Sequence, residues 1–241
     1  MRKKRGYNRE TPIALLRDYK LFAIACEGGK REPAYFRAFQ YMSNRIAVDL
    51  IEEIVSDEEA LAINPNKSAP KWVLERAIRY IEKEGLNDED DLWFILDVDR
   101  WEYSQLKEIA DFCEQNANWN IVLSNPCFEV WLYFHKRKNI KDSESKTCGD
   151  FKFEISKFEK GGYHPLKWIP DLLIAIENSK DTDLNKDYFF PDINTTKLYQ
   201  LGEAIIEVVG KKGFEKYCEN IIPKLLQEEI GRTKRNIKDN L

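Results

Sequence analysis

Three short apolar runs, each followed at once by an acidic motif, constrain the fold more than any other feature of this sequence. The runs are Leu21–Cys26, Leu92–Leu96 and Ile121–Leu123. Continuous apolar runs of this kind are typical of strands that are buried on both faces of a parallel sheet. Segments with the apolar spacing of helices lie between them. The sequence therefore predicts an α/β fold, with a mostly parallel sheet flanked by helices.

The remaining elements of the first half follow from apolar spacing and from residues that begin or end helices. A further strand is predicted over Ile46–Val55, and the Asn-Pro-Asn segment within Asp57–Pro70 predicts a loop. Helices are predicted to begin at Glu32 and to cover residues 72–83, 104–115 and 128–138. The resulting order, β-α-β-α-β-α-β, is typical of a parallel sheet with right-handed crossovers.

The composition changes after about residue 140, where no convincing apolar strand run remains. Residues 141–150 are polar and predict a loop. Helices are predicted over residues 151–158, 168–177, 195–209 and 214–230, with Gly210–Gly213 as one of the breaks between them. We therefore expect a basic N-terminal lead-in at residues 1–19, an α/β core at 20–141 and a mainly helical C-terminal region at 142–241 that packs on the core.

Composition and absent motifs exclude several classes of protein. The 241 residues carry a net charge of -4, so the chain as a whole is not a basic nucleic-acid binder, although local basic clusters such as residues 135–141 could follow a phosphate backbone. Two histidines, and five cysteines without a CxxC pair, give little support to a zinc site or a nucleophile triad. Walker A, G-x-S-x-G and G-x-G-x-x-G motifs are absent. No apolar run approaches the length of a membrane span, so we expect a cytoplasmic protein without membrane contact.

The Asp97-Val-Asp99 motif follows the strongest predicted strand. Because the two aspartates are two residues apart on an extended segment, they point to the same side, with Cα atoms roughly 6–7 Å apart. Such a pair can share one hard cation or approach two. Mg²⁺ prefers oxygen ligands of this type, with Mn²⁺ as a substitute. Since open α/β sheets bind ligands outside the carboxyl ends of their strands, we expect Asp97 and Asp99 to hold a divalent metal for phosphate-ester chemistry.

Glu27 stands at the end of the first strand, directly before Gly28, Gly29 and Lys30. Glycine lets backbone N–H groups approach an anion, and the N-terminus of the following helix adds partial positive charge. The turn could therefore bind a substrate phosphate while Glu27 binds metal or acts as a general base. An ordinary solvent-exposed turn is the alternative, and the turn alone does not decide between the two.

The third motif, Ser124-Asn-Pro-Cys-Phe-Glu129, opens the helix predicted over residues 128–138. Glu129 could complement the helix dipole or serve as a further metal ligand, and both interpretations stay open. Ser124 and Asn125 could cap the helix or hydrogen-bond a substrate phosphate. His135 lies further along the same helix, where a packed or surface role is favoured over a catalytic one.

Taken together, the motifs resemble those of the RloB-like family, in the same order over roughly residues 20–200. The matching blocks are Cys26-Glu-Gly-Gly29 with Glu32-Pro-x-Tyr-Phe36, Asp97-Val-Asp-Arg100, Ser124-Asn-Pro-Cys-Phe-Glu-x-Trp-Leu132 with His135, and Asp192-Ile-Asn-Thr-Thr196. The third block is the most specific. The chain departs from the family pattern at Arg31, where the family has threonine, and at Ile193, where it has proline.

The resemblance implies a Toprim-like fold, in which Glu27 is the general acid/base and Asp97 and Asp99 hold Mg²⁺. It also implies a nuclease that cleaves RNA, such as tRNA, in phage defence by abortive infection. A DNA endonuclease linked to a restriction–modification locus is one alternative, and a non-catalytic module that binds a regulatory partner subunit is another. Turnover of small nucleotides and a homodimeric state also stay open.

Overall fold

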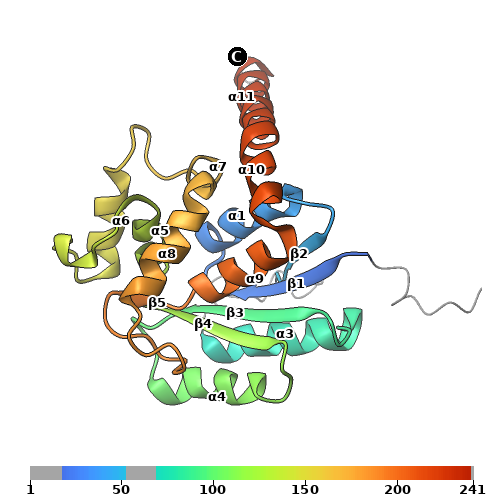
Figure 1. Ribbon diagram of the computed structural model, residues 1–241, viewed down its shortest axis with the longest axis vertical. Helices are drawn as coiled ribbons and strands as arrows, with labels where there is room; N and C mark the ends of the chain where they lie inside the picture. The colour runs from blue at the N-terminus through green and yellow to red at the C-terminus, as the bar shows by residue number, and fades with distance from the viewer. Residues whose placement is uncertain (1–17, 53–68, 240–241) are drawn as a thin grey trace, which may run out of the picture.

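The computed structural model describes residues 18–52 and 69–239, and within these residues the strands form one sheet in the order β2-β1-β3-β4-β5 (Figure 1). The strands are β1 Lys20–Cys26, β2 Ile46–Leu50, β3 Asp91–Asp97, β4 Trp119–Asn125 and β5 Thr195–Thr196. Strands β1 to β4 run parallel, whereas the short β5 pairs antiparallel with the end of β4. The predicted α/β class, with a mostly parallel sheet flanked by helices, is confirmed.

Helices connect the strands and build the C-terminal region. Those of the first half are α1 Arg31–Arg37, α3 Pro70–Glu84, α4 Tyr103–Cys113 and α5 Glu129–Lys136. Those that follow are α6 Cys148–Ser156, α7 Pro165–Trp168, α8 Leu172–Thr182, α9 Tyr199–Val209, α10 Lys211–Asn220 and α11 Ile222–Asp239. Short 3-10 turns lie at η2 Ala38–Tyr41, η3 Ile140–Asp142 and η4 Ile169–Asp171. None of the helices in the described part of the chain has both the length and the apolar character that crossing a membrane requires.

The strands are buried on both faces because helices cover both. Along β1, Phe22 and Ile24 belong to one hydrophobic core, and Ala23 and Ala25 belong to the other. Helices α1, α5, α8 and α9 cover the first face, and α3 and α4 cover the second (Figure 1). Both faces of β1 must therefore be apolar, which is why this strand appears in the sequence as a continuous apolar run.

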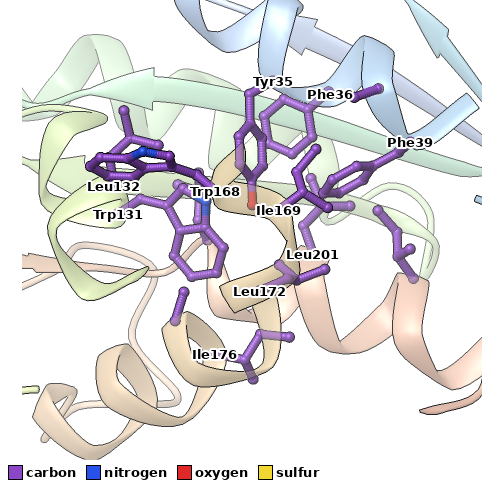
Figure 2. Close-up of a cluster of buried hydrophobic side chains, with 14 of the residues drawn as sticks. Tyr35, Phe36, Phe39, Trp131, Leu132, Trp168, Ile169, Leu172, Ile176 and Leu201 are labelled. Carbon is purple, nitrogen blue, oxygen red and sulfur yellow. The ribbon is translucent and has the colours of Figure 1, made fainter. Parts of the chain in front are cut away.

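The larger core joins the sheet to the C-terminal helices. Figure 2 shows Tyr35 and Phe36 of α1, Trp131 of α5, Trp168 of α7 and Leu201 of α9 meeting in one cluster. Both tryptophans are fully buried. Burial of a large apolar side chain contributes about 1.5–3 kcal/mol. The C-terminal helices thus share their core with α1 and α5, which follow the carboxyl ends of β1 and β4.

A proline and a glycine explain where α3 begins and ends. Pro70 occupies the first turn, where its missing N–H has no helical partner to lose. Gly85 ends the helix with a φ of 72°, a left-handed conformation that favours glycine. Val73 and Ala77 lie on the inner face of α3 and are fully buried in the second core.

The helix predicted over residues 195–209 is found with its predicted end, but its predicted start is wrong, and a short strand lies where no strand was expected. Thr195 and Thr196 form strand β5, and α9 begins only at Tyr199. Thr196 is fully buried, and its hydroxyl lies 2.7 Å from the Ser124 hydroxyl on β4. Pairing with β4 therefore determines the conformation here, and a two-residue strand leaves no periodic pattern in the sequence.

Several other boundaries also differ from the prediction. The loop expected over residues 141–150 contains the end of η3 and the start of α6, where the Thr147 side chain accepts the Asp150 N–H. The helix expected over 168–177 is divided into α7, η4 and α8, with Pro170 in η4. The helix expected over 214–230 is divided into α10 and α11, with Gly213 inside α10. Strand β2 ends at Leu50, so residues 51 and 52 of its predicted range are not strand. Residues 53–55 of that range and most of the 57–70 loop lie outside the described residues.

Candidate functional site

The predicted acidic residues lie where the strand order of the sheet reverses. From β1 the chain moves to β2 on one side and then to β3 on the other, so that β1 and β3 are neighbours. Glu27 directly follows β1, and Asp97 is the last residue of β3. The two strands carry both carboxylates to the carboxyl edge of the sheet, at the switch point where open α/β sheets bind ligands.

Backbone hydrogen bonds hold Glu27 and Asp97 in place. The Asp97 N–H donates to Glu27 Oε2 at 2.9 Å, and the Glu27 N–H donates to the Ile95 carbonyl at 2.9 Å. Asp97 Oδ1 accepts the Phe128 N–H at 2.8 Å, immediately before α5 begins. Asp97 therefore lies against the N-terminus of a helix, whose partial positive charge favours an anion. Both side chains are fixed by regular elements.

These carboxylates open into a pocket of about 450 Å³. Within the described residues its lining contains the acids Glu27, Glu32, Asp97, Asp99 and Glu129, the cations Lys30, Arg31, Arg100 and Lys152, and Gly28, Gly29 and Cys148. The structure thus brings together the predicted acids and the predicted glycine turn. We call this the acidic pocket.

Burial changes the protonation of the two central acids. Burial raises the pKa of Glu27 from 4.5 to about 7, against the lowering effect of the Asp97 N–H and of Trp101; Asp99 and Glu32 add to the rise. The Trp101 N–H makes no hydrogen bond of ordinary geometry, so its contribution is weak. Burial also raises the pKa of Asp97 well above its usual range, and the neighbouring carboxylates, Glu27 first, raise it further. A carboxyl group with a pKa near 7 is suited to accepting and returning a proton at neutral pH.

Glu32 is an acid of the pocket to which the sequence motifs assigned no chemistry. It stands in the first turn of α1 and is 8% exposed. Its carboxylate packs against Gly28, so that a Cβ on residue 28 would collide with it unless Glu32 moved. Burial raises the pKa of Glu32, and the charge of Glu129 adds to this rise. In the sequence, a glutamate before Pro33 indicates only the start of a helix. That pattern does not predict that Glu32 lines the pocket.

Glu129 lies in the pocket with its charge already compensated. Its side chain is 4% exposed and forms an ion pair with Arg31. Lys152 Nζ lies 4.0 Å from Glu129 Oε1, and the Arg31 guanidinium lies 5.9 Å from the centre of the Tyr163 ring. Arg31 is also where the chain departs from the threonine of the family pattern. The role of Glu129 as a metal ligand stays a prediction, and a metal there would compete with Arg31.

Asp99 faces the C-terminal helical region. The Cys148 thiol donates to Asp99 Oδ2 at 3.1 Å, and Arg100 Nε lies 3.7 Å from the same oxygen. Cys148 and Lys152 both belong to α6. Residues on both sides of the boundary predicted near residue 141 therefore line the pocket. Motifs at the ends of strands do not predict this contribution from α6.

Ser124, Asn125 and His135 do not line the acidic pocket. Ser124 is buried and bonded to Thr196, and Asn125 Nδ2 donates to the Pro191 carbonyl at 3.1 Å. Neither caps α5, whose first residue is preceded by Phe128. His135 is 2% exposed, with its ring nitrogens 2.9 Å from the Tyr35 hydroxyl and 3.0 Å from the Trp131 carbonyl. Burial lowers the pKa of His135 to about 3, so the ring stays neutral, as a packed histidine does.

Carboxylate oxygens are the donors that a hard cation such as Mg²⁺ prefers. Among the described residues, no three Asp, Glu, His or Cys side chains stand close enough together to enclose a metal ion as they are placed. The carboxylate oxygens of Glu27, Asp97 and Asp99 are of the type that Mg²⁺ prefers, although the three side chains as placed do not enclose an ion.

A family model described as RloB-like protein matches residues 22–205. The chain belongs to the RloB-like family. The matched region includes every acid of the pocket, strand β3 and all but the first two residues of β1, as well as Cys148 and Lys152 of α6. Comparison with curated proteins found no match, and comparison with solved structures found none either.

Proposed function

We propose that this RloB-like protein is a Mg²⁺-dependent nuclease that hydrolyses phosphodiester bonds, with RNA preferred over DNA. One observation carries the proposal: Glu27 and Asp97 converge from neighbouring strands on a pocket that also contains Asp99 and four cationic side chains. Buried carboxylates suit a hard divalent cation, and lysine and arginine suit the phosphates of a nucleic acid. The Toprim-like fold implied by the family resemblance supports the same chemistry.

The pocket residues divide the work of hydrolysis among them. Mg²⁺, held by Asp97 and Asp99, would offset the negative charge of the scissile phosphate. Glu27, with a pKa of about 7, accepts the proton of the attacking water and returns a proton to the leaving oxygen. Lys30 is exposed at the glycine turn and contacts a phosphate of the substrate. Glu129 keeps Arg31 in the pocket through their ion pair.

The biological setting rests on the resemblance alone. We propose that the protein acts in phage defence by abortive infection, where cleavage of an abundant RNA such as tRNA halts the cell. Expression of the wild-type protein is then toxic, and toxicity requires the acids of the pocket. Sequencing of RNA ends from the intoxicated cells identifies the cleaved class.

Cleavage by the purified protein tests the proposal. Labelled RNA, single-stranded DNA, duplex DNA and small nucleotides are incubated with Mg²⁺, with Mn²⁺ or with EDTA. We expect RNA cleavage with either metal, none with EDTA, and a loss of about 100- to 10,000-fold in Glu27→Gln. Exposed Glu108→Gln is the matched control and keeps full activity.

The other outcomes separate the alternatives. Cleavage of DNA alone would move the protein to the DNA endonucleases, and turnover of nucleotides alone would move it to the small-molecule hydrolases. Failure to cleave any substrate, together with failure to bind Mg²⁺ or Mn²⁺, would favour a non-catalytic module that binds a partner.

A further inference from the structure

Four aromatic rings form one cluster at the start of helix α4. Tyr103 begins helix α4, and Tyr188, Phe189 and Phe190 belong to the loop before β5. The Tyr103 ring centre lies 5.7 Å from that of Phe189 and 5.5 Å from that of Phe190, and the Tyr188 ring centre lies 5.4 Å from that of Phe189. The Tyr188 hydroxyl donates to the Tyr103 hydroxyl at 2.9 Å. Two segments distant in sequence therefore build one aromatic surface.

Two of these rings lie at the protein surface and two support them. Tyr103 is 43% exposed and Tyr188 is 48% exposed. Phe189 and Phe190 are partly buried and pack against the core formed by α3, α4 and the sheet. Clustered exposed aromatic groups are uncommon on a protein surface that has no binding role.

The loop that carries Tyr188 is fixed to the sheet at several points. The buried Lys197 Nζ donates to Asp183 Oδ2 and to the Asn185 carbonyl, both at 2.6 Å. Asn125 at the end of β4 donates to the Pro191 carbonyl. The aromatic rings are thus presented on a rigid support, which lowers the entropy lost when they bind a ligand.

Tyr103 is linked to the acidic pocket through a short stretch of chain that begins at Asp99. Tyr103 follows Asp99 by four residues, at the same carboxyl edge of the sheet. Arg100 lies between them, 69% exposed and 3.7 Å from Asp99. Lys107 lies one turn after Tyr103 on α4, is 48% exposed and forms an ion pair with Asp111. Glu102, the acid next to Tyr103, caps the N-terminus of α4 with its side chain. Side chains that can bind phosphates, Arg100 and Lys107, therefore lie close in sequence to the Tyr103 ring, which can stack with a base.

We propose that Tyr103 and Tyr188 form a base-stacking surface that holds a single-stranded nucleic acid while its backbone passes Arg100 into the acidic pocket. This inference rests on the proposed nuclease function and names its substrate class. Single strands are bound by aromatic rings that stack with unpaired bases, together with cations that follow the backbone. The bases of a duplex are already stacked on one another and cannot use the two tyrosines.

Binding of a fluorescent oligonucleotide to the full chain tests the proposal. The probe is a single-stranded RNA of about 12 nucleotides, with the duplex of the same sequence for comparison. Fluorescence anisotropy is recorded in EDTA, so that binding is measured without cleavage. We expect Tyr103→Ala and Tyr188→Ala each to raise the Kd for the single strand by about tenfold or more. Both side chains are exposed, and thermal unfolding verifies that the variants fold.

Two control variants separate stacking from other effects. Tyr103→Phe keeps the ring and loses the hydroxyl, so we expect its Kd to stay within about threefold of wild type if stacking dominates. Tyr41→Ala removes another exposed tyrosine, which lines a separate groove with Leu225 and Arg232, and should bind as wild type does.

Three results would overturn the stacking surface: unchanged binding in both alanine variants, duplex binding as tight as single-strand binding, or no binding of RNA by the wild type. Exposed Leu184 and Ile193 lie in the same loop, so docking of a protein is the competing use of this surface. Protein docking would be indicated if the wild type self-associates, the alanine variants do not, and none of them binds RNA.

Cleavage with Mg²⁺ is scored separately from binding. Binding that depends on the tyrosines, without any cleavage, would refute the nuclease function and support the base-stacking surface. Cleavage that neither alanine variant changes would support the nuclease function and refute the base-stacking surface.

Discussion

Replacement of Glu27 by glutamine should stabilise the folded protein at pH 8 and change its stability little at pH 4.5. The pKa of Glu27 is raised in the folded state, so the folded protein binds this proton more tightly than the unfolded chain does. Stability is therefore lost as the pH rises from about 4.5 to about 7, and the full cost is present above that range. Glutamine cannot ionise, and its side-chain oxygen can still accept the Asp97 N–H.

The size of the effect follows from the pKa. A rise from 4.5 to about 7 corresponds to roughly 3 kcal/mol at about 1.4 kcal/mol per pH unit. Removing the charge also relieves Asp97, whose raised pKa depends in part on Glu27. We expect Glu27→Gln to be more stable than wild type by about 3 kcal/mol at pH 8, and by less than about 0.5 kcal/mol at pH 4.5.

Urea unfolding followed by circular dichroism measures this difference at a series of pH values without added metal. Glu108→Gln, at an exposed position on α4, is the control and should follow wild type at every pH. His135 also adds a pH dependence to unfolding, because its pKa is lowered to about 3 only in the folded protein and the unfolded chain takes up a proton near pH 6.5. It is present in all three proteins, so its effect cancels from the difference. A Glu27→Gln variant that is less stable than wild type at pH 8, or a difference that does not vary with pH, would refute a buried and charged Glu27.

Three further predictions concern the scaffold. Trp168→Ala empties a fully buried position and should cost about 3–5 kcal/mol in urea unfolding, whereas Phe153→Ala, 65% exposed, should change stability by less than about 0.5 kcal/mol; equal effects would contradict the assigned core. Lys197→Met leaves the buried Asp183 without its cation and should cost about 3–5 kcal/mol, and a neutral result would show that this pair does not anchor the loop. The ring signals of His135 should not titrate in NMR spectra between pH 8 and pH 5, since its pKa is about 3; a midpoint near pH 6.5 would mean that the ring is exposed to solvent.

The sequence predicts best the strands that are buried on both faces. Strands β1 and β3 are covered by helices on both faces, so their apolar runs are continuous and unmistakable. The acids that follow them are found together at one edge because parallel neighbours end at the same side of a sheet. Glu27 and Asp97 could thus be placed from the sequence alone.

Other parts of the site depend on contacts that leave no local pattern. Cys148 and Lys152 reach the pocket from α6, about 50 residues after Asp99, through packing of the C-terminal helices. The ion pair between Arg31 and Glu129 joins segments that are 98 residues apart. Strand β5 is two residues long and forms because Thr196 bonds with Ser124. Tertiary contact decides these features, and spacing within one segment cannot predict them.

The central claim is that the acids of the pocket support metal-dependent cleavage of nucleic acid. The most direct measurement is the rate of RNA cleavage as a function of Mg²⁺ concentration, for wild type, Asp97→Asn and the exposed control Asp88→Asn. We predict a rate that rises and saturates with Mg²⁺ in wild type and in the control, and a loss of at least about 100-fold in Asp97→Asn. Cleavage by Asp97→Asn at the wild-type rate, or cleavage by wild type that persists in EDTA, would contradict the account.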